Sequence, residues 1–320
     1  MAAAPRVWVL MDDRAGHSAQ SLGLAQRVSL PYLIKRLHYS PLAKLPSWLV
    51  ATSRCGLTRA TRRELKAPWP ELVIAAGRRT VPVMRYIKKR SPNTKLVQLM
   101  WPHRLDPFDA IIAPAHDKTP FDPRILRTIG SLHALSHPAL EQAAKHYAPA
   151  FEHLPGPFVA VLIGGTTRHG SLKPADIERL GDMAELLCGQ GGSLLISTSR
   201  RSPANTAAIL KKRLTCAHHI FDWQSGDDNP YLGLLALADA IIVTGDSISM
   251  CSEACYTGKP VFTFAPKHLI GSKHHQFLQT LHDEGYAVPL SPQSQLDWKP
   301  RETLDEAGRI VSHLHTLLTK

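Results

Sequence analysis

The sequence predicts an α/β protein in which two successive domains each hold a parallel β-sheet covered by helices. Short apolar runs of strand length alternate with helical segments along the 320 residues, and this alternation is typical of βαβ units. It weakens near the middle of the chain and then restarts. Each half also begins with a strand that runs into a loop of small residues. A chain of this length is long for one hydrophobic core and comfortable for two.

The first domain is expected to span residues 1–150. Its apolar runs predict strands at 6–11, 32–38, 71–76, 95–100 and 109–113. Helices are expected from about residue 19, over 53–66 and up to residue 90, with a loop over 41–46. Periodicity is weak and proline is frequent from 119 to 156, so we place the connection between the domains there.

The second domain, residues 151–320, repeats the pattern. Strands are predicted at 158–163, 193–198, 219–223, 240–243 and 261–264. Helices are predicted at 174–188, 203–213, 228–237, 274–285 and 302–318, with one more that Gly258 ends. Residues 240–264 therefore form a βαβ unit, and the start of its helix is a place where anions bind. Both halves fit a Rossmann-like domain.

Composition indicates a globular protein of the cytoplasm. Apolar residues make up 44% and charged residues 20% of the chain. No apolar run approaches the roughly 20 residues of a membrane helix, and the strand that begins at Arg6 leaves no space for a signal peptide. The odd number of cysteines, five, at irregular spacings favours reduced thiols.

Positive charge is concentrated in the first half. Residues 1–150 hold 23 Lys and Arg against 9 Asp and Glu, whereas residues 151–320 hold 15 against 17. Two basic clusters contribute, each expected on one helical face: Arg59, Arg62, Arg63 and Lys66, and then Arg85, Lys88 and Lys89. Each cluster alone is compatible with an ordinary solvated surface. Together they favour an anionic partner, namely the inner face of a membrane or a lipid-linked acceptor, rather than a nucleic acid.

Ligands of open parallel sheets bind at the carboxyl ends of the strands. The candidate residues at or near these ends are Asp12, Asp13, Gly16, His17, Gly164, Gly165, Thr166, Thr167, Arg168, Ser199, Arg200, Arg201, Phe221, Asp246, Ser247, Ser249 and Glu253. Glycines and hydroxyls bring backbone N–H groups against phosphate, and arginines neutralise it. Glu253 is expected to accept two hydrogen bonds from ribose hydroxyls. In its alternative role, the Glu253 carboxylate only stabilises its helix by interacting with the helix dipole.

His17 is the candidate general base, since imidazole titrates near neutral pH. Asp12 or Asp13 is expected either to orient the imidazole or to act as the base itself. No G-x-G-x-x-G follows the first strand and no P-loop pattern is present, so dehydrogenases and P-loop NTPases fit poorly. No cysteine and histidine spacing matches a zinc site, and neither a metal nor another cofactor is expected.

Several stretches resemble one family along nearly the whole chain. They are VWVLMDDRAGHSAQSLGLA, AAGRRTVPV, LISTSRRSP, DDNPYLGLLALADAIIVTGDSISMCSEACYTGKPV and the KHHQF segment. These stretches resemble the bacterial members of the mitochondrial fission ELM family. The resemblance brings no assigned reaction. Plant members act at the mitochondrial outer surface and recruit dynamin-related proteins, a partner expected here only if the plant role carries over.

At a greater distance the layout resembles GT-B glycosyltransferases, such as the peptidoglycan N-acetylglucosaminyl transferase and lipid A disaccharide synthase. This resemblance implies two Rossmann-like domains facing across a cleft. Gly16 and His17 would then face the sugar, Gly164–Thr166 the diphosphate, backbone near Phe221 the base and Glu253 the ribose. The DDRAGHS loop departs from those enzymes because it lacks their glycine-rich run.

The first hypothesis is a metal-independent glycosyltransferase that uses a nucleoside-diphosphate sugar and a cell-envelope acceptor. His17 or Asp13 would deprotonate the acceptor hydroxyl, and arginines would stabilise the leaving diphosphate. A nucleotide-sugar epimerase on the same fold is a close variant. The alternative from another class is a non-catalytic adaptor that docks, peripherally, on the membrane or on a protein.

Overall fold

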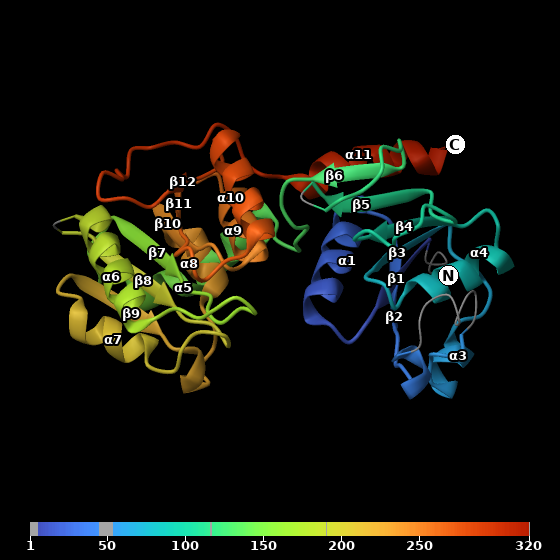
Figure 1. Cartoon of the computed structure of the whole chain (residues 1–320), viewed down its shortest axis with the longest axis horizontal. Coiled ribbons are helices and arrows are strands. Elements are labelled where there is room, and N and C mark those ends of the chain that lie inside the picture. Colours follow the sequence, from blue (N-terminus) through green and yellow to red (C-terminus); the bar gives the residue numbers. More distant parts are fainter. Residues whose placement is uncertain (1–5, 45–53, 116, 190, 320) are drawn as a thin grey trace. The chain divides into compact units, whose positions relative to one another are not determined.

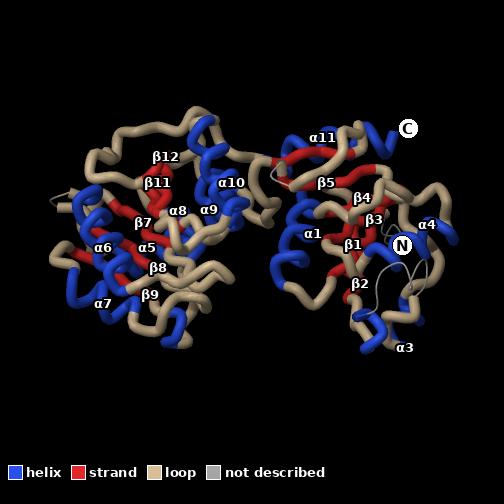
Figure 2. Tube along the Cα trace, viewed as in Figure 1, coloured by secondary structure: helices blue, strands red, loops and turns tan. Residues whose placement is uncertain are grey.

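The computed structural model describes residues 6–44, 54–115, 117–189 and 191–319. The chain divides into two compact units (Figure 1). The N-terminal unit comprises Met1–Ala134 and Asp305–Lys320, and the C-terminal unit comprises Leu135–Leu304. Within each unit, strands form a central sheet with helices on its faces (Figure 2). No helix of the described residues is both long and apolar enough to cross a membrane.

The N-terminal unit holds a six-stranded parallel sheet in the order β2-β1-β3-β4-β5-β6. The strands are β1 (Val7–Met11), β2 (Tyr32–Arg36), β3 (Leu72–Ala76), β4 (Lys95–Leu99), β5 (Ala110–Pro114) and β6 (Ile125–Thr128). The helices are α1 (Ala15–Val28), η1 (Pro41–Lys44), α3 (Arg59–Glu64), α4 (Val81–Arg90) and α11 (Glu306–Thr319). Because successive strand residues point to opposite faces, Val7 and Val9 pack with α1 and α11, whereas Trp8 and Leu10 pack with α4.

The C-terminal unit holds a second six-stranded parallel sheet, in the order β12-β11-β10-β7-β8-β9. Its strands are β7 (Phe158–Leu162), β8 (Ser193–Ser197), β9 (Ala217–Phe221), β10 (Ala240–Thr244), β11 (Val261–Phe264) and β12 (Val288–Pro289). Its helices are α5 (His137–Phe151), α6 (Pro174–Cys188), α7 (Thr206–Arg213), η2 (Trp223–Ser225), α8 (Tyr231–Leu237), α9 (Ile248–Tyr256) and α10 (Ser272–Asp283). Numbered within the unit, the strand order is that of dinucleotide-binding Rossmann domains.

The α/β class and the two parallel sheets confirm the predicted fold class. The units divide within the region 119–156, where the connection was predicted, but this region is more regular than its sequence indicates, because it contains β6 and all of α5. The prolines are tolerated there: Pro138 lies in the first turn of α5 and Pro149 in its last turn, while the Ser136 hydroxyl caps the helix at 3.3 Å from Ala139 N. The predicted helix 53–66 is limited to α3. Residues 45, 46 and 53 of the predicted loop and helix lie outside the described residues.

The unit boundary also differs from the predicted residue 150. It lies between Ala134 and Leu135, because α5 packs on α8 of the C-terminal unit. Helix α11 returns to the N-terminal unit, where Ile310 and Leu314 are buried in the core beside α1. Charge remains asymmetric with these bounds, since the N-terminal unit holds 24 Lys and Arg against 10 Asp and Glu.

Candidate functional site

Each sheet has one point at which the strand order reverses, and ligands of α/β sheets bind outside the carboxyl ends of the strands at this point. In the N-terminal unit the reversal falls between β1 and β3. In the C-terminal unit it falls between β7 and β10. The predicted residues after these four strands are therefore brought together in two groups, one in each unit.

The glycine loop after β7 is bound to its own surroundings. Gly164 N donates to Thr244 Oγ1 at 2.7 Å, and Gly165 N donates to Asp246 Oδ2 at 2.9 Å. Thr166 N donates to Arg201 O at 2.8 Å. All three N–H groups that the sequence assigned to a diphosphate thus have internal acceptors. These internal hydrogen bonds occupy the N–H groups, so a phosphate here would be bound by side chains.

Asp246 fills the reversal point of the C-terminal sheet. Its side chain is fully buried and pairs with Arg201 Nη2 at 3.1 Å, and its Oδ1 accepts from Thr244 Oγ1 at 2.7 Å. A side chain on Gly164 would collide with this carboxylate, which explains the glycine. Asp246 therefore holds the loops together, and its predicted place near a diphosphate stays a prediction.

Most hydroxyls at this edge also stabilise the loops. Ser199 Oγ donates to Gly164 O at 3.1 Å, and Thr167 Oγ1 donates to Leu269 O at 2.8 Å. The Ser247 hydroxyl caps α9 by accepting from Met250 N at 3.4 Å, while Ser249 is exposed. Sequence reasoning missed Ser202, whose hydroxyl donates to Gly164 O at 2.5 Å. Its position directly after Arg200 and Arg201 was the available signal.

Three predicted arginines carry the positive charge of this edge. Arg168 and Arg200 are exposed, and Arg168 Nε lies 3.0 Å from His169 Nε2. The side chain of Arg201 is 40% exposed although it pairs with Asp246. These guanidinium groups are therefore accessible to an anionic ligand, and guanidinium binds phosphate through two parallel hydrogen bonds.

A cavity of about 100 Å³ opens at the same edge of the sheet. Its lining residues are Leu162, Ile163, Ser197, Thr198, Ser199, Arg200, Trp223, Asn229, Tyr231 and Met250. Phe221, predicted to lie beside a base, is buried in the core, and its carbonyl accepts from Thr198 N at 3.0 Å. The aromatic wall is instead Trp223, which is 44% exposed. A ring-shaped ligand would stack there.

Glu253 is not among the described residues that line this cavity, but it contacts one of them, Tyr231. Its Oε2 accepts from the Tyr231 hydroxyl at 2.5 Å. Burial raises the pKa of Glu253, and the hydrogen bond from Tyr231 partly opposes this rise. Burial, and next the charge of Glu253, raise the pKa of Tyr231 well above its usual value. Sequence reasoning missed Tyr231, although it follows the polar Asp228-Asn229-Pro230 turn.

His17 and Asp12 form a dyad at the carboxyl end of β1. His17 Nδ1 lies 2.9 Å from Asp12 Oδ2, and the side chains are 15% and 1% exposed. The second carboxylate oxygen of Asp12 accepts from Arg14 N at 3.0 Å. Gly77, at the end of β3, has φ of +82° and leaves room for the imidazole. Asp12 is thus placed to orient the imidazole of His17 through Nδ1, while the role of His17 as a base stays a prediction.

Asp13 and Gly16 have looser surroundings. The Asp13 carboxylate is 62% exposed and pairs with Arg79, whose guanidinium also stacks 4.5 Å above the ring of Tyr39. Gly16 is exposed, and a β-carbon built on it would meet no atom within 4 Å. Of the two predicted orienting carboxylates, the structure joins Asp12 to His17 and Asp13 to Arg79.

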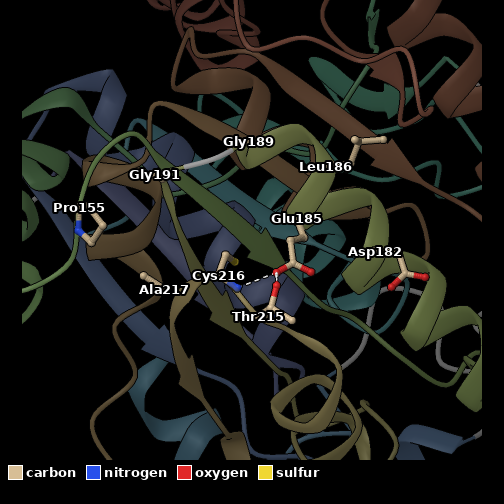
Figure 3. A pocket seen from close by; sticks show the side chains of 10 residues that line it. Pro155, Asp182, Glu185, Leu186, Gly189, Gly191, Thr215, Cys216 and Ala217 are labelled. Carbon is tan, nitrogen blue, oxygen red and sulfur yellow. Dashed lines mark hydrogen bonds between the residues drawn. The ribbon is translucent and has the colours of Figure 1, made fainter.

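A larger cavity, of about 620 Å³, lies at the opposite edge of the C-terminal sheet (Figure 3). It is lined by Pro155, Asp182, Glu185, Leu186, Gly189, Gly191, Gly192, Thr215, Cys216 and Ala217. Glu185 accepts from Thr215 N and Cys216 N at 2.8 and 2.6 Å, as the dashed lines of Figure 3 show. This acidic lining does not suit a diphosphate, and none of the predicted site residues contributes to it.

The two basic clusters are only partly accessible. Arg62 donates to Leu57 O and Cys55 O at 2.9 and 2.6 Å, and Lys88 pairs with Asp109 at 3.0 Å. Burial, and the nearby Arg104, lower the pKa of Arg85. Arg59, Arg63, Lys66 and Lys89 are exposed. The predicted common helical face does not extend to Lys66, because α3 ends at Glu64.

Comparisons with known proteins identify a family. A family model described as Mitochondrial fission ELM1 matches residues 15–318. The chain is 33% identical over 345 residues to "Uncharacterized protein RP120" of Rickettsia prowazekii (strain Madrid E), covering 95% of this chain and 96% of that protein. It is 32% identical over 258 residues to "Mitochondrial fission protein ELM1" of Arabidopsis thaliana, covering 72% of this chain and 59% of the plant protein.

Solved structures show the fold. MurG of Acinetobacter baumannii matches with a TM-score of 0.50 at 14% identity, covering 98% of this chain and 92% of that chain. UDP-GlcNAc 2-epimerase of Methanocaldococcus jannaschii matches with a TM-score of 0.51 at 13% identity, covering 97% of this chain and 99% of that chain. A UDP-glucosyltransferase of Polygonum tinctorium matches with a TM-score of 0.51 at 11% identity, covering 99% of this chain and 94% of that chain. The chain has the GT-B fold of two Rossmann-like domains. At the described residues, no group of three or more His, Cys, Asp or Glu side chains is arranged to hold a metal ion.

Proposed function

The chain belongs to the Mitochondrial fission ELM1 family, whose name assigns no reaction, and from the fold and the geometry above we propose that it is a glycosyltransferase of the GT-B fold. Its donor is a nucleoside-diphosphate sugar, bound by the C-terminal unit, and its acceptor is a hydroxyl of the cell envelope. The observation that carries the proposal is the cavity beside Trp223 and Arg200 at the carboxyl edge of the C-terminal sheet. The neighbours' printed names support the donor class, since two of them name UDP-linked substrates.

The donor is held by side chains. The base stacks on Trp223 in the cavity, and the diphosphate meets the exposed guanidinium groups of Arg168 and Arg200. Arg201 contributes less, because Asp246 already neutralises it. As the bond between sugar and diphosphate breaks, negative charge develops on the leaving diphosphate. Fixed guanidinium groups stabilise that charge more in the transition state than in the ground state.

The acceptor is activated by the dyad of the N-terminal unit. His17 Nε2 removes the proton of the acceptor hydroxyl. Asp12 accepts a hydrogen bond from His17 Nδ1 and so holds the imidazole in the tautomer whose Nε2 is unprotonated. The hydroxyl oxygen then attacks the anomeric carbon, and the diphosphate leaves with the bonding electrons. The alternative activity on this fold is that of an epimerase, which isomerises the sugar without an acceptor. The name of the UDP-GlcNAc 2-epimerase with the same fold suggests this alternative.

Binding and transfer are tested separately. Isothermal titration with UDP-, GDP-, ADP-, CMP- and dTDP-linked sugars measures binding, and Trp223→Ala and Arg200→Ala should each weaken it by at least tenfold. Arg213→Ala is the matched control, because Arg213 pairs with Asp182 away from this edge. Release of nucleoside diphosphate in the presence of envelope lipids measures transfer. His17→Gln should bind the donor normally but lose release. Absence of binding to every donor overturns the proposal, and an isomerised nucleotide sugar formed without acceptor favours the epimerase.

A second candidate function is a non-catalytic adaptor at a membrane surface in the cytoplasm. The exposed cations Arg59, Arg63, Lys66 and Lys89 favour it, as does the printed name of the plant relative. Flotation with vesicles containing anionic lipid tests this function. Arg59→Glu with Arg63→Glu should reduce bound protein, whereas Lys211→Glu with Lys212→Glu, on exposed α7 of the other unit, should not. Binding that both pairs leave unchanged argues against a membrane role for the N-terminal unit.

A further inference from the structure

Tyr231 connects the small cavity of the C-terminal unit to Glu253. As the first residue of α8 it forms part of the cavity wall. Its hydroxyl donates to Glu253 Oε2 at 2.5 Å. Glu253 is not one of the ten described residues that line the cavity. The cavity wall therefore includes Tyr231 but not Glu253.

The phenol hydroxyl of Tyr231 donates its one hydrogen bond to Glu253. A separation of 2.5 Å is typical of a charge-assisted bond between a hydroxyl and a carboxylate. A carboxylate can only accept hydrogen bonds, so the donor is Tyr231, and its oxygen keeps lone pairs for another partner. The raised pKa of Tyr231, caused first by burial, keeps the phenol protonated at neutral pH. In this state the phenol oxygen can only accept a hydrogen bond from a ligand, so it favours a ligand group that donates one, such as a sugar hydroxyl.

Tyr231 is held in place before any ligand arrives. Its backbone N donates to Asn229 Oδ1 at 3.0 Å, which fixes the start of α8. Asn229 O in turn accepts from the Tyr147 hydroxyl of α5 at 3.3 Å. A side chain on Gly233 would collide with the Tyr147 ring, so α5 and α8 pack closely. Little conformational freedom is lost when such a group binds a ligand.

We propose that Tyr231 recognises a ribose hydroxyl of the bound nucleotide and that Glu253 is a positioning residue that accepts the hydrogen bond of the phenol. This inference rests on the proposed function, because it requires a nucleotide in the cavity. It moves the ribose contact, which the sequence assigned to Glu253, to a tyrosine on another helix. It also gives the site a means to reject deoxynucleotides, since a deoxyribose leaves the phenol oxygen without its donor.

The test compares ribose with deoxyribose on the same base. Isothermal titration measures the dissociation constants of UDP, GDP, ADP and CDP, and then those of the 2′-deoxy and 3′-deoxy forms of the tightest binder. Wild type should prefer the ribonucleotide over one deoxy form by about fivefold to tenfold, as expected for one hydrogen bond. In Tyr231→Phe this preference should fall to near one. Tyr286→Phe is the matched control, because its hydroxyl donates to Glu302 Oε1 at 2.7 Å and Tyr286 is not among the described residues that line the cavity, so this variant should keep the wild-type preference.

Glu253→Gln separates the inference from the simpler assignment. Glutamine offers a carbonyl oxygen to the phenol, so at least half of the preference should remain. Loss of the preference in Glu253→Gln with retention in Tyr231→Phe overturns the inference and makes Glu253 the ribose ligand. Equal binding of ribonucleotides and deoxynucleotides by wild type overturns it as well. If no nucleotide binds, the proposed function fails and the inference fails with it.

Discussion

Replacing Gly77 by alanine tests the arrangement of the His17–Asp12 dyad. Gly77 has φ of +82°, and a β-carbon there would lie 2.5 Å from both Nδ1 and Cε1 of His17. The left-handed backbone costs about 1–2 kcal/mol for a residue with a β-carbon. Overpacking adds about 1–3 kcal/mol, and the stiffer unfolded chain returns about 0.4–1 kcal/mol. Gly77→Ala should therefore destabilise the N-terminal unit by about 1–5 kcal/mol.

The loss is measured by native-state hydrogen exchange of peptides that contain β1 and β3, which reports on this unit alone. Gly16→Ala is the matched control, because no atom lies within 4 Å of its added β-carbon. Its unfolding free energy should remain within about 0.5 kcal/mol of wild type or rise. A Gly77→Ala protein as stable as the Gly16→Ala protein would show that the imidazole does not lie against Gly77.

Three further predictions concern stability. Burial lowers the pKa of His133 to about 4, so the folded protein binds fewer protons than the unfolded protein between about pH 4 and 6.5. Stability should be complete above pH 6.5 and should fall, by up to about 3 kcal/mol, as the pH drops towards 4. Urea unfolding at pH 7 and 5 should show a smaller loss in His133→Gln, and an equal loss would contradict this assignment. Asp246→Ala removes the acceptor of Gly165 N and the partner of Arg201, and should cost about 2–4 kcal/mol of unfolding free energy. Asp182→Ala breaks an exposed pair with Arg213 and should cost under about 1 kcal/mol; similar losses would refute the buried role of Asp246. Leu314→Ala should speed exchange of the β1 peptide by the equivalent of about 2–5 kcal/mol, because Leu314 is fully buried against the N-terminal unit. Faster exchange confined to the C-terminal unit would place α11 elsewhere.

The strands were predictable because parallel strands buried on both faces are continuous apolar runs. Runs such as 71–76 and 240–243 therefore gave the fold class and the position of the site edge. Helix α5 was hidden by its prolines, which are tolerated only because of where they fall in the helix. The return of α11 depends on packing between segments nearly 300 residues apart, and periodicity within a window cannot reveal such packing.

The sequence predicted the position of the candidate site better than the role of each residue in it. The residues after β1, β7, β8 and β10 do lie at carboxyl ends of strands, as the topology requires. Asp246 and the N–H groups after β7, however, bond to one another, and side-chain partners of this kind appear only in three dimensions. Tyr231 was overlooked because a tyrosine after Asn-Pro has no sequence signature of ligand binding. The assignments of His17 and Arg200 stay predictions.

A crystal structure of the protein with a tightly binding nucleoside diphosphate tests the central claim most directly. We expect density for the base beside Trp223 in the cavity of the C-terminal unit, with the phosphates within hydrogen-bond distance of Arg168 or Arg200. Density in the acidic cavity beside Glu185, or none at the carboxyl edge of the sheet at saturating ligand, would contradict it.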